Sequence, residues 1–335
     1  MNDIILFSSV THSEGGGIYR AHLDNEGKLT PYTYVPADQP QYGAVSGGRI
    51  FFTLRAPFPG SKLGGLSYLP LNFGNGDKIS APINLCGLIA CHIAVQDNDI
   101  YTANYSSGSC SHAKIEGDSL RLVKVVSHNG KGPNAARQEM AHTHHALVTP
   151  DGRYVIFTDL GIDRLVVYDR SLNPVGEVTL APGLGPRHTA FSNDGRYAFV
   201  ITELGCTIES FEYSDGSFTH IASYDLLPAG YTERDKSYGC ALRLSKDGSR
   251  LYVCTRYIDT VSVFEVDGGD LREIQRIECG GSWPRDINLT LDGKFLISAN
   301  QRENTITVFA IENNGLIKRC PGELIMKEPL NIICL

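Results

Sequence analysis

The sequence has no block of lysine or arginine residues, and its formal net charge is −7. Surfaces that bind nucleic acid or anionic membranes concentrate positive charge, so we expect neither partner. The sequence also lacks a long apolar run, and its start, MNDIILFSSV, carries Asp3 where a signal peptide would carry basic residues. We therefore expect a cytoplasmic protein, in which a few placed cations hold any bound anion.

The nine cysteines include no C-x-x-C pair. Their spacing offers no structural zinc site, and an odd number of scattered cysteines is typical of buried free thiols in a reducing compartment. The sequence thus implies neither a metal nor a cofactor. Hydrophobic residues make up 42% of the chain and charged residues 20%, which is sufficient for a packed core and excludes extensive disorder.

What the sequence does contain is an internal repeat. Four segments align on their Asp-Gly pairs, at intervals of about 40 to 55 residues. These segments are residues 144–169, 187–213, 240–266 and 285–311. Weaker copies precede them at residues 3–23, 43–55 and 91–115. A repeat of this length is typical of a modular fold in which each copy forms one unit.

Each unit has the pattern of four β-strands with a tight Asp-Gly turn after the first. Four strands in a unit of this length are typical of a propeller blade, because the period is too long for a β-helix and the copies are too alike for two sandwiches. We predict an all-β, seven-bladed propeller of four-stranded antiparallel blades, in one domain over residues 1–335. The tail EPLNIICL should close the ring as the innermost strand of the first blade.

In such a blade, the start of the first strand and the end of the second lie on the same face. Polar residues occupy both places in several units. At the first place the sequence has His144, Arg187, Cys240 and Arg285, with His142 and His188 beside them. At the second it has Asp159, Glu203, Arg256, Asn300 and Gln301, and the third unit adds His92, Asn104 and Tyr105. Because burying such groups unpaired is costly, their convergence predicts a pocket at one mouth of the channel.

Other interpretations of these residues are structural. Propellers use polar side chains to line their axis, so Arg187 and Glu203 can be a purely structural ion pair. His145 alternates with His144 along its strand, and we expect it to pack in the core. The remaining histidines fall in predicted loops or outer strands and should lie on the surface; they are His12, His22, His112, His128 and His220.

Several motifs resemble the seven-bladed propeller lactonase family, which includes propeller-type 6-phosphogluconolactonases and fungal carboxymuconate cyclases. The motifs are HTHHALVTPDG, GPRHTAFSNDGRYAFVITEL, LYVCTRYIDTVSVF, PRDINLTLDGKFLISANQRENTITVF, TANYSSGS and GGGIYRAHLDNEGKL. The likeness extends over essentially the full chain. It implies a site made of His142 or His144, Arg187, Glu203 and Arg256, which belong to the set that the blade geometry brings together.

The first functional hypothesis is hydrolysis of a sugar-acid lactone, and the resemblance favours 6-phosphogluconolactone, which would give 6-phosphogluconate. Ring opening needs a base that activates water, and Glu203 or a neutral His144 can be that base. It also needs positive charge where the oxyanion forms, and Arg187 and Arg256 can supply that charge. Further substrate-binding candidates are His142, His188 and Arg285 for a phosphate, and Asn104, Asp159 and Gln301 for hydroxyl groups, with His92 nearby. The expected partner is a small anionic substrate, without a metal.

Two other functions are compatible with the same pattern. The first is cycloisomerisation of a carboxymuconate-type dicarboxylate to a lactone, in which paired arginines would hold two carboxylates. The second is a noncatalytic propeller that serves as an interaction platform. A platform would expose an apolar patch, and the sequence offers only residues 55–65, RAPFPGSKLGG, as a candidate.

Overall fold

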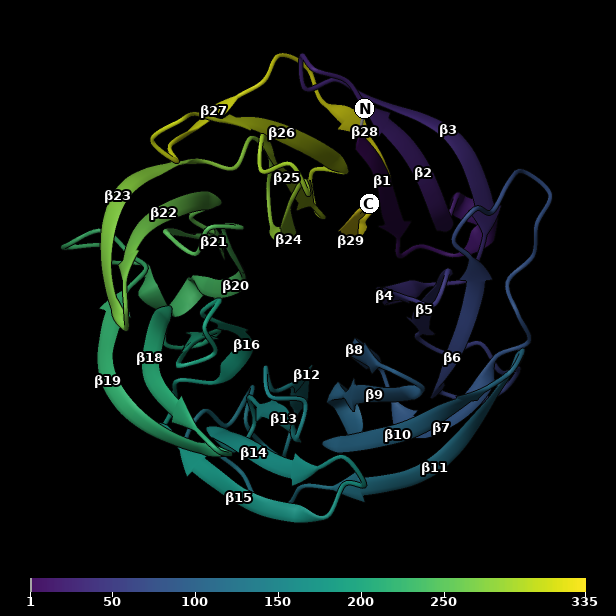
Figure 1. The fold of residues 1–335 in the computed structure, drawn as a ribbon, viewed down its shortest axis with the longest axis horizontal. Helices are drawn as coiled ribbons and strands as arrows, with labels where there is room; N and C mark the ends of the chain where they lie inside the picture. The colour runs from purple at the N-terminus through teal and green to yellow at the C-terminus, as the bar shows by residue number, and fades with distance from the viewer. Residues whose placement is uncertain (1) are drawn as a thin grey trace.

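Seven antiparallel β-sheets surround a central axis in the computed structural model, which describes residues 2–335 (Figure 1). The chain runs around the ring once, and both termini lie in the same sector of it. The predicted seven-bladed propeller is therefore confirmed. Regular structure outside the sheets, within the described residues, consists of three short 3-10 helices, η1 (His12–Glu14), η2 (Tyr105–Ser107) and η3 (Arg234–Lys236).

The strands of each blade follow one another from the axis outward. Blades 1 and 2 consist of β29 (Pro329–Cys334), β1 (Asn2–Ser8), β2 (Gly17–Leu23) and β3 (Leu29–Pro36), and of β4 (Pro40–Ser46), β5 (Arg49–Leu54), β6 (Leu63–Pro70) and β7 (Ile83–Leu88). Blades 3 and 4 consist of β8 (Ala90–Gln96), β9 (Asp99–Asn104), β10 (Ser109–Glu116) and β11 (Ser119–Ser127), and of β12 (Thr143–Val148), β13 (Tyr154–Asp159), β14 (Arg164–Asp169) and β15 (Pro174–Thr179).

Blades 5 and 6 consist of β16 (Pro186–Phe191), β17 (Tyr197–Thr202), β18 (Thr207–Ser214) and β19 (Ser217–Asp225), and of β20 (Tyr238–Leu244), β21 (Arg250–Arg256), β22 (Thr260–Asp267) and β23 (Asp270–Glu278). Blade 7 consists of β24 (Pro284–Leu289), β25 (Phe295–Asn300), β26 (Thr305–Ile311), β27 (Ile317–Arg319) and β28 (Leu324–Ile325). None of the helices in residues 2–335 has the length and hydropathy needed to cross a membrane.

The Asp-Gly pairs form the turns between the first and second strands of blades 4 to 7. In blade 4, the Thr149 hydroxyl donates a hydrogen bond to Asp151, whose carboxylate also accepts the Arg153 backbone N–H. Gly152 has φ +70°, a left-handed conformation that glycine adopts without steric cost. The same arrangement recurs at the other Asp-Gly turns, with a serine or threonine two residues before the aspartate. These turns lie at one end of each blade. The second strands, β13, β17, β21 and β25, finish at the opposite end.

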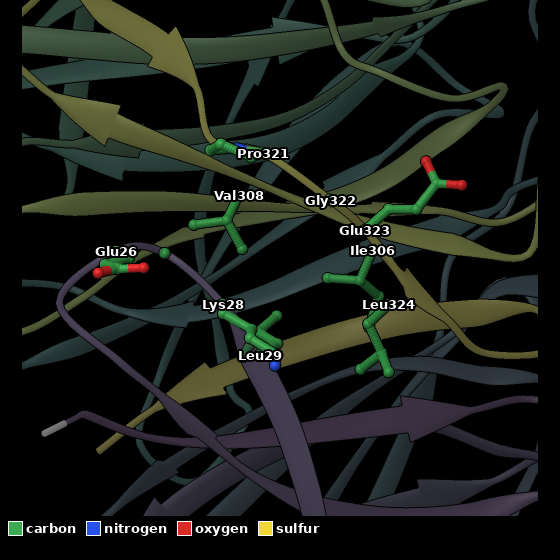
Figure 2. A pocket seen from close by; sticks show the side chains of 10 residues that line it. Glu26, Lys28, Leu29, Ile306, Val308, Pro321, Gly322, Glu323 and Leu324 are labelled. Atoms are coloured by element: carbon green, nitrogen blue, oxygen red, sulfur yellow. The ribbon is translucent and has the colours of Figure 1, made fainter.

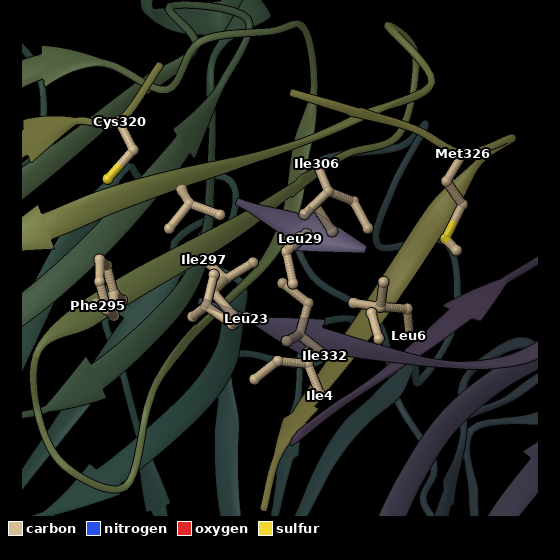
Figure 3. Packing of buried hydrophobic residues seen from close by; sticks show 13 residues of the cluster. Ile4, Leu6, Leu23, Leu29, Phe295, Ile297, Ile306, Cys320, Met326 and Ile332 are labelled. Carbon is tan, nitrogen blue, oxygen red and sulfur yellow. The ribbon is translucent and has the colours of Figure 1, made fainter. Parts of the chain in front are cut away.

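Ring closure depends on β29, which pairs with β1 as the innermost strand of blade 1. The predicted role of the C-terminal tail is therefore confirmed. Apolar side chains from both ends of the chain pack together behind this strand, and Figure 3 shows Ile4 and Leu6 of β1 beside Ile332 of β29. The same cluster includes Ile297 and Ile306 of blade 7, so it joins the last blade to the first.

The outer edge of blade 7 departs from the four-strand pattern. Two short strands, β27 and β28, pair with different parts of β26, and residues 321–323 form the connection between them. Beside this connection lies a hollow of about 310 Å³ between blades 1 and 7, lined by Leu29, Ile306 and Val308 with Glu26 and Glu323 at its rim (Figure 2). It opens on the outer side of the ring and contains none of the predicted site residues.

Candidate functional site

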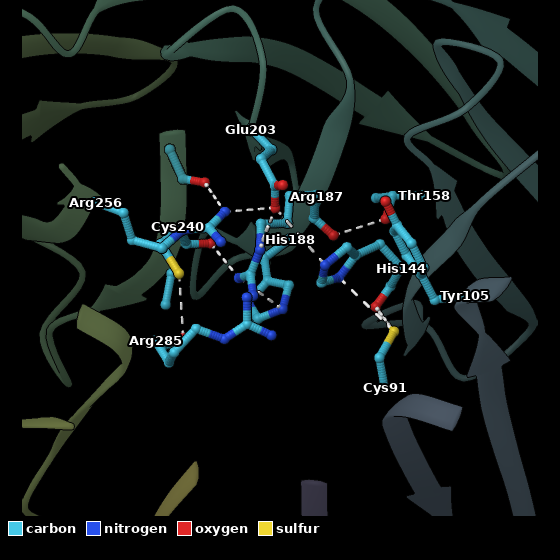
Figure 4. A network of polar contacts seen from close by, with 12 residues as sticks. Cys91, Tyr105, His144, Thr158, Arg187, His188, Glu203, Cys240, Arg256 and Arg285 are labelled. Carbon is cyan, nitrogen blue, oxygen red and sulfur yellow. Dashed lines mark hydrogen bonds and ion pairs between the residues drawn. The ribbon is translucent and has the colours of Figure 1, made fainter. Parts of the chain in front are cut away.

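A β-bulge interrupts the pairing of the inner strand in blades 3 to 7. In blade 5, for example, Pro186 pairs with Thr202 and His188 with Ile201, so that Arg187 is left out of the ladder. A bulge releases one residue from the regular alternation and redirects its side chain. The residues released in this way are Cys91, His144, Arg187, Cys240 and Arg285, and in blade 6 also Ala241. Figure 4 shows the five named polar side chains gathered at one place around the axis.

Glu203 is the centre of this group. It directly follows β17, it is only 2% exposed, and both of its carboxylate oxygens have cationic partners. Oε2 lies 3.0 Å from Arg187 Nε and 2.6 Å from Arg256 Nη2, while Oε1 lies 2.5 Å from Arg137 Nη2. Arginines from blade 5, from blade 6 and from the loop before blade 4 therefore meet at one carboxylate. Figure 4 shows Glu203 with Arg187 and Arg256.

The sequence interpretation missed Arg137. This residue belongs to the loop between β11 and β12, outside the repeated unit, so the alignment of the blades gave no signal for it. Its guanidinium also donates a hydrogen bond to the Tyr105 hydroxyl, at 3.3 Å, and lies over the Tyr238 ring. Arg137 thus covers the Glu203 carboxylate from the side of the loop.

The charges around Glu203 decide its protonation state. Burial by itself would raise the pKa of Glu203, but Arg256, Arg187 and Arg137 together hold that pKa well below the usual 4.5. The carboxylate is therefore ionised at neutral pH, and its lone pairs are occupied by guanidinium donors. A carboxylate of this kind is a weak proton acceptor.

His144 has the opposite character. Burial, reinforced by the charge of Arg187, lowers the pKa of His144 well below 6.5, so its imidazole is neutral. Its Nε2 lies 3.8 Å from Glu203 Oε2, its Nδ1 lies 3.9 Å from Cys91 Sγ, and the edge of its ring faces Tyr105. A neutral imidazole keeps one lone pair, and Glu203 is close enough to stabilise the imidazolium that forms when it takes a proton.

A second group of aromatic side chains, which we call the imidazole arc, lies directly beside these residues. It consists of Tyr42, His92, His145 and His188, one from each of blades 2 to 5. Neighbouring ring centroids are 4.2 Å apart for Tyr42 and His92, 4.0 Å for His92 and His145, and 4.8 Å for His145 and His188. His145 is buried, as predicted, although it packs against other histidines and not in an aliphatic core.

The imidazole arc is also neutral at physiological pH. Burial lowers the pKa of all three histidines, that of His145 to about 3, and the charges of Arg187 and Arg243 add to the effect. One donor in the arc has no protein partner. Arg187 Nη1, which can only donate, lies 3.2 Å from His188 Nε2, so we assign the proton of His188 to Nδ1, which is buried and has no acceptor among residues 2–335.

Acidification should therefore destabilise the fold. The unfolded chain binds protons at His92, His145 and His188 below their usual pKa of 6.5, whereas the folded chain keeps these imidazoles neutral. The stability they contribute is present above pH 6.5 and is lost as pH falls below it. We expect the free energy of unfolding in urea to decrease by about 2 kcal/mol between about pH 7.5 and about pH 6. An unfolding free energy that does not change over this pH interval would contradict the burial of these three histidines in their neutral form.

Two predicted substrate-binding residues lie outside this group. Asn104 is fully buried and donates its amide hydrogens to Ser109 and Ser111 within its own blade. Asp159 is also fully buried, and its carboxylate accepts the backbone N–H groups of His142 and Gly161. Both side chains satisfy polar groups inside the sheets, so the structure places neither at the mouth of the channel.

His142 and Gln301 lie near the group without touching Glu203. The His142 ring stacks on Tyr105 at a centroid distance of 4.5 Å, and its Nε2 lies 3.2 Å from Glu139. Gln301 lines a separate hollow of about 430 Å³, whose other walls are Trp283, Arg302, Asn304 and Glu328. Trp283 lines this hollow and also contacts the group around Glu203, because Arg256 lies over its ring.

The predictions for the remaining histidines and the cysteines are partly wrong. His12, His22 and His220 are exposed, but His112 is buried beside Asp99, and the His128 imidazole is buried with its Nδ1 2.7 Å from Asp159. Both therefore have carboxylate partners inside a blade. All nine cysteines are free, and Cys86 is exposed while six others are buried. Residues 2–335 contain no group of three or more His, Cys, Asp or Glu side chains placed to hold a metal ion.

Comparison with known proteins adds an independent line of evidence. A family model described as "Lactonase, 7-bladed beta-propeller" matches residues 4–334. The chain is 34% identical to a 6-phosphogluconolactonase of Bacillus subtilis, over 96% of this chain and 95% of that protein. It superposes on the crystal structure of a Lactobacillus plantarum protein with a TM-score of 0.91 and 30% identity, over 100% of both chains. For a periplasmic gluconolactonase of Pseudomonas aeruginosa the TM-score is 0.90 and the identity 25%, over 100% and 99% of the two chains.

Proposed function

Because the chain belongs to the seven-bladed β-propeller lactonase family, we propose that it hydrolyses a sugar-acid lactone, with 6-phosphogluconolactone as the preferred substrate. One observation carries the proposal. A neutral imidazole, His144, lies beside several guanidinium groups that a single carboxylate, Glu203, holds in place. Lactone hydrolysis needs this combination, since a base must activate water while positive charge stabilises the oxyanion.

In the proposed reaction, His144 takes a proton from a water molecule, whose oxygen attacks the lactone carbonyl carbon. The carbonyl oxygen becomes negatively charged, and Arg187 and Arg256 stabilise it. When this intermediate collapses, the bond between the carbonyl carbon and the ring oxygen breaks, and the proton on His144 passes to the departing alkoxide. The product is an open-chain hydroxy acid, which loses its carboxylic proton to solvent.

Glu203 has a positioning role in this scheme. Its depressed pKa and its three guanidinium partners make it a poor base, so we assign the proton transfer to His144. The carboxylate fixes Arg187 and Arg256 in one orientation and compensates the imidazolium charge while His144 carries the proton. Preorganised charges of this kind need no rearrangement as the oxyanion forms, which is the source of their catalytic effect.

The relatives support lactone hydrolysis and leave the substrate to be tested. The B. subtilis relative is named a 6-phosphogluconolactonase, and the P. aeruginosa protein is named a gluconolactonase. The corresponding lactones differ in one phosphate group. The purified protein should be incubated with each lactone, and lactone loss should be compared with the spontaneous reaction in the same buffer. A rate equal to the spontaneous one on both lactones would overturn the proposal.

A second candidate is cycloisomerisation of a carboxymuconate-type dicarboxylate. The excess of arginines around Glu203 favours it, since four guanidiniums that share one protein carboxylate can also bind the carboxylates of a substrate. The decrease of diene absorbance would measure this activity on the same preparation. Turnover of the muconate without lactone hydrolysis would reverse our assignment.

A further inference from the structure

The mouth of the channel carries more positive than negative charge. Four arginines lie in the group around Glu203, namely Arg137, Arg187, Arg256 and Arg285. Three of them share the Glu203 carboxylate as a partner. One carboxylate cannot neutralise four guanidiniums, so the group as a whole attracts an anion.

Arg285 is the arginine that the protein leaves unpaired. Within residues 2–335 its guanidinium has neither a carboxylate within ion-pair distance nor a hydrogen-bond acceptor. Burial and the neighbouring charges of Arg256 and Arg187 lower its pKa to about 10, so it remains charged at neutral pH. Arg285 also keeps part of its surface accessible, whereas Glu203, Arg187 and Arg256 are almost completely buried.

The local backbone holds Arg285 in this position. Arg285 is the residue released by the bulge in β24, and its carbonyl oxygen accepts a hydrogen bond from Cys240 Sγ at 3.2 Å. Figure 4 shows its side chain extending from that anchor toward the group that contains Arg187 and His188. A guanidinium that is partly accessible and has no acceptor among residues 2–335 indicates a ligand that accepts hydrogen bonds.

We propose that Arg285 is the anion receptor of this site and makes the protein selective for lactones that carry a phosphate. The inference rests on the proposed function and names the residue that recognises the phosphate of its substrate. Arg187 and Arg256 are held by Glu203 next to His144, so they serve the reacting carbonyl. Arg285 has no such partner in the described part of the chain, and its planar guanidinium can bind two oxygens of a phosphate attached to the far end of the substrate.

The test compares Arg285→Gln with the wild type on 6-phosphogluconolactone and on glucono-δ-lactone. We expect kcat/KM for the phosphorylated lactone to fall about 100-fold, mainly through KM, and kcat/KM for the neutral lactone to stay within about threefold. Arg285→Lys should give an intermediate kcat/KM for the phosphorylated lactone, since lysine keeps the positive charge but lacks the paired N–H donors of the guanidinium. Arg302→Gln is the matched control: among residues 2–335 Arg302 has no carboxylate partner either, but it stacks on Trp283 outside the group. Equal losses on both lactones, or no loss on either, would overturn the role of Arg285.

A binding measurement separates this inference from the proposed function. Calorimetric titration with 6-phosphogluconate and with gluconate needs no turnover. The wild type should bind 6-phosphogluconate more tightly, and Arg285→Gln should abolish the difference while Arg302→Gln retains it. If the wild type does not distinguish the two acids, or if Arg285→Gln distinguishes them as the wild type does, the inference is wrong, whatever the hydrolysis assay shows.

Discussion

Replacing His144 by asparagine should lower kcat for lactone hydrolysis about 10²- to 10⁴-fold, because the substitution removes the group that accepts the proton from water. Asparagine keeps hydrogen-bonding capacity at the bulge of β12 but has no basic nitrogen. Steady-state kinetics on the lactone that the wild type prefers would measure the effect. KM should change much less than kcat, since His144 acts on water and not on the bound sugar acid.

A matched control for this variant is His112→Asn. His112 is also a buried histidine, but its partner is Asp99 in blade 3 and it lies outside the group around Glu203. The control should keep kcat within about threefold of the wild type while it loses a comparable buried contact. If His144→Asn retained kcat at the level of the control, the base would have to be another residue.

Replacing Glu203 by glutamine should weaken both the fold and the reaction. The substitution leaves the guanidiniums of Arg137, Arg187 and Arg256 without their carboxylate, and removal of one partner of a buried ion pair costs about 3–5 kcal/mol. We expect a decrease of this size in the free energy of unfolding in urea. We also expect kcat/KM to fall about 10²-fold, because the oxyanion-stabilising arginines lose their orientation.

Glu209→Gln is the control for Glu203→Gln. Glu209 is a buried glutamate of the same blade, but its partners are Thr207, His220 and Ser223, none of which is an arginine. Its replacement should cost less stability and leave kcat unchanged. The depressed pKa of Glu203 adds a pH criterion: its contribution is present above the usual pKa of 4.5 and is lost as pH falls below it. Equal stability of the two variants at neutral pH would contradict the arrangement around Glu203.

Much of the fold followed from the repeat alone. The Asp-Gly turns fix where the first strand of a blade ends, and the tail EPLNIICL had no other strand to pair with than the first. The convergence of His144, Arg187, Glu203 and Arg256 also followed, since equivalent positions of adjacent blades must meet around the axis. Repetition makes distant contacts predictable because each blade repeats the geometry of its neighbour.

The predictions that failed concern contacts which the repeat does not encode. Arg137 comes from a loop between blades, so no equivalent position revealed it. His112 and His128 were assigned to the surface, but each meets an aspartate on another strand of the ring. Asp159 is the last residue of β13, whereas Glu203 lies one residue beyond the end of β17, and the Asp159 carboxylate caps backbone N–H groups of its own blade. A shift of one residue along the chain thus accompanies the difference between an internal cap and a group that meets the arginines.

The position of β29 determines when the ring of this protein can first close. Every side chain of the group around Glu203 has been synthesised once the growing chain includes residue 285, but blade 1 then still lacks its innermost strand. Until β29 is made, Asp286 of β24 also lacks the hydrogen bond that Asn331 of β29 donates to it at 2.8 Å. A nascent chain therefore carries the whole group around Glu203 in an open arc. Only the synthesis of β29 converts that arc into a closed ring.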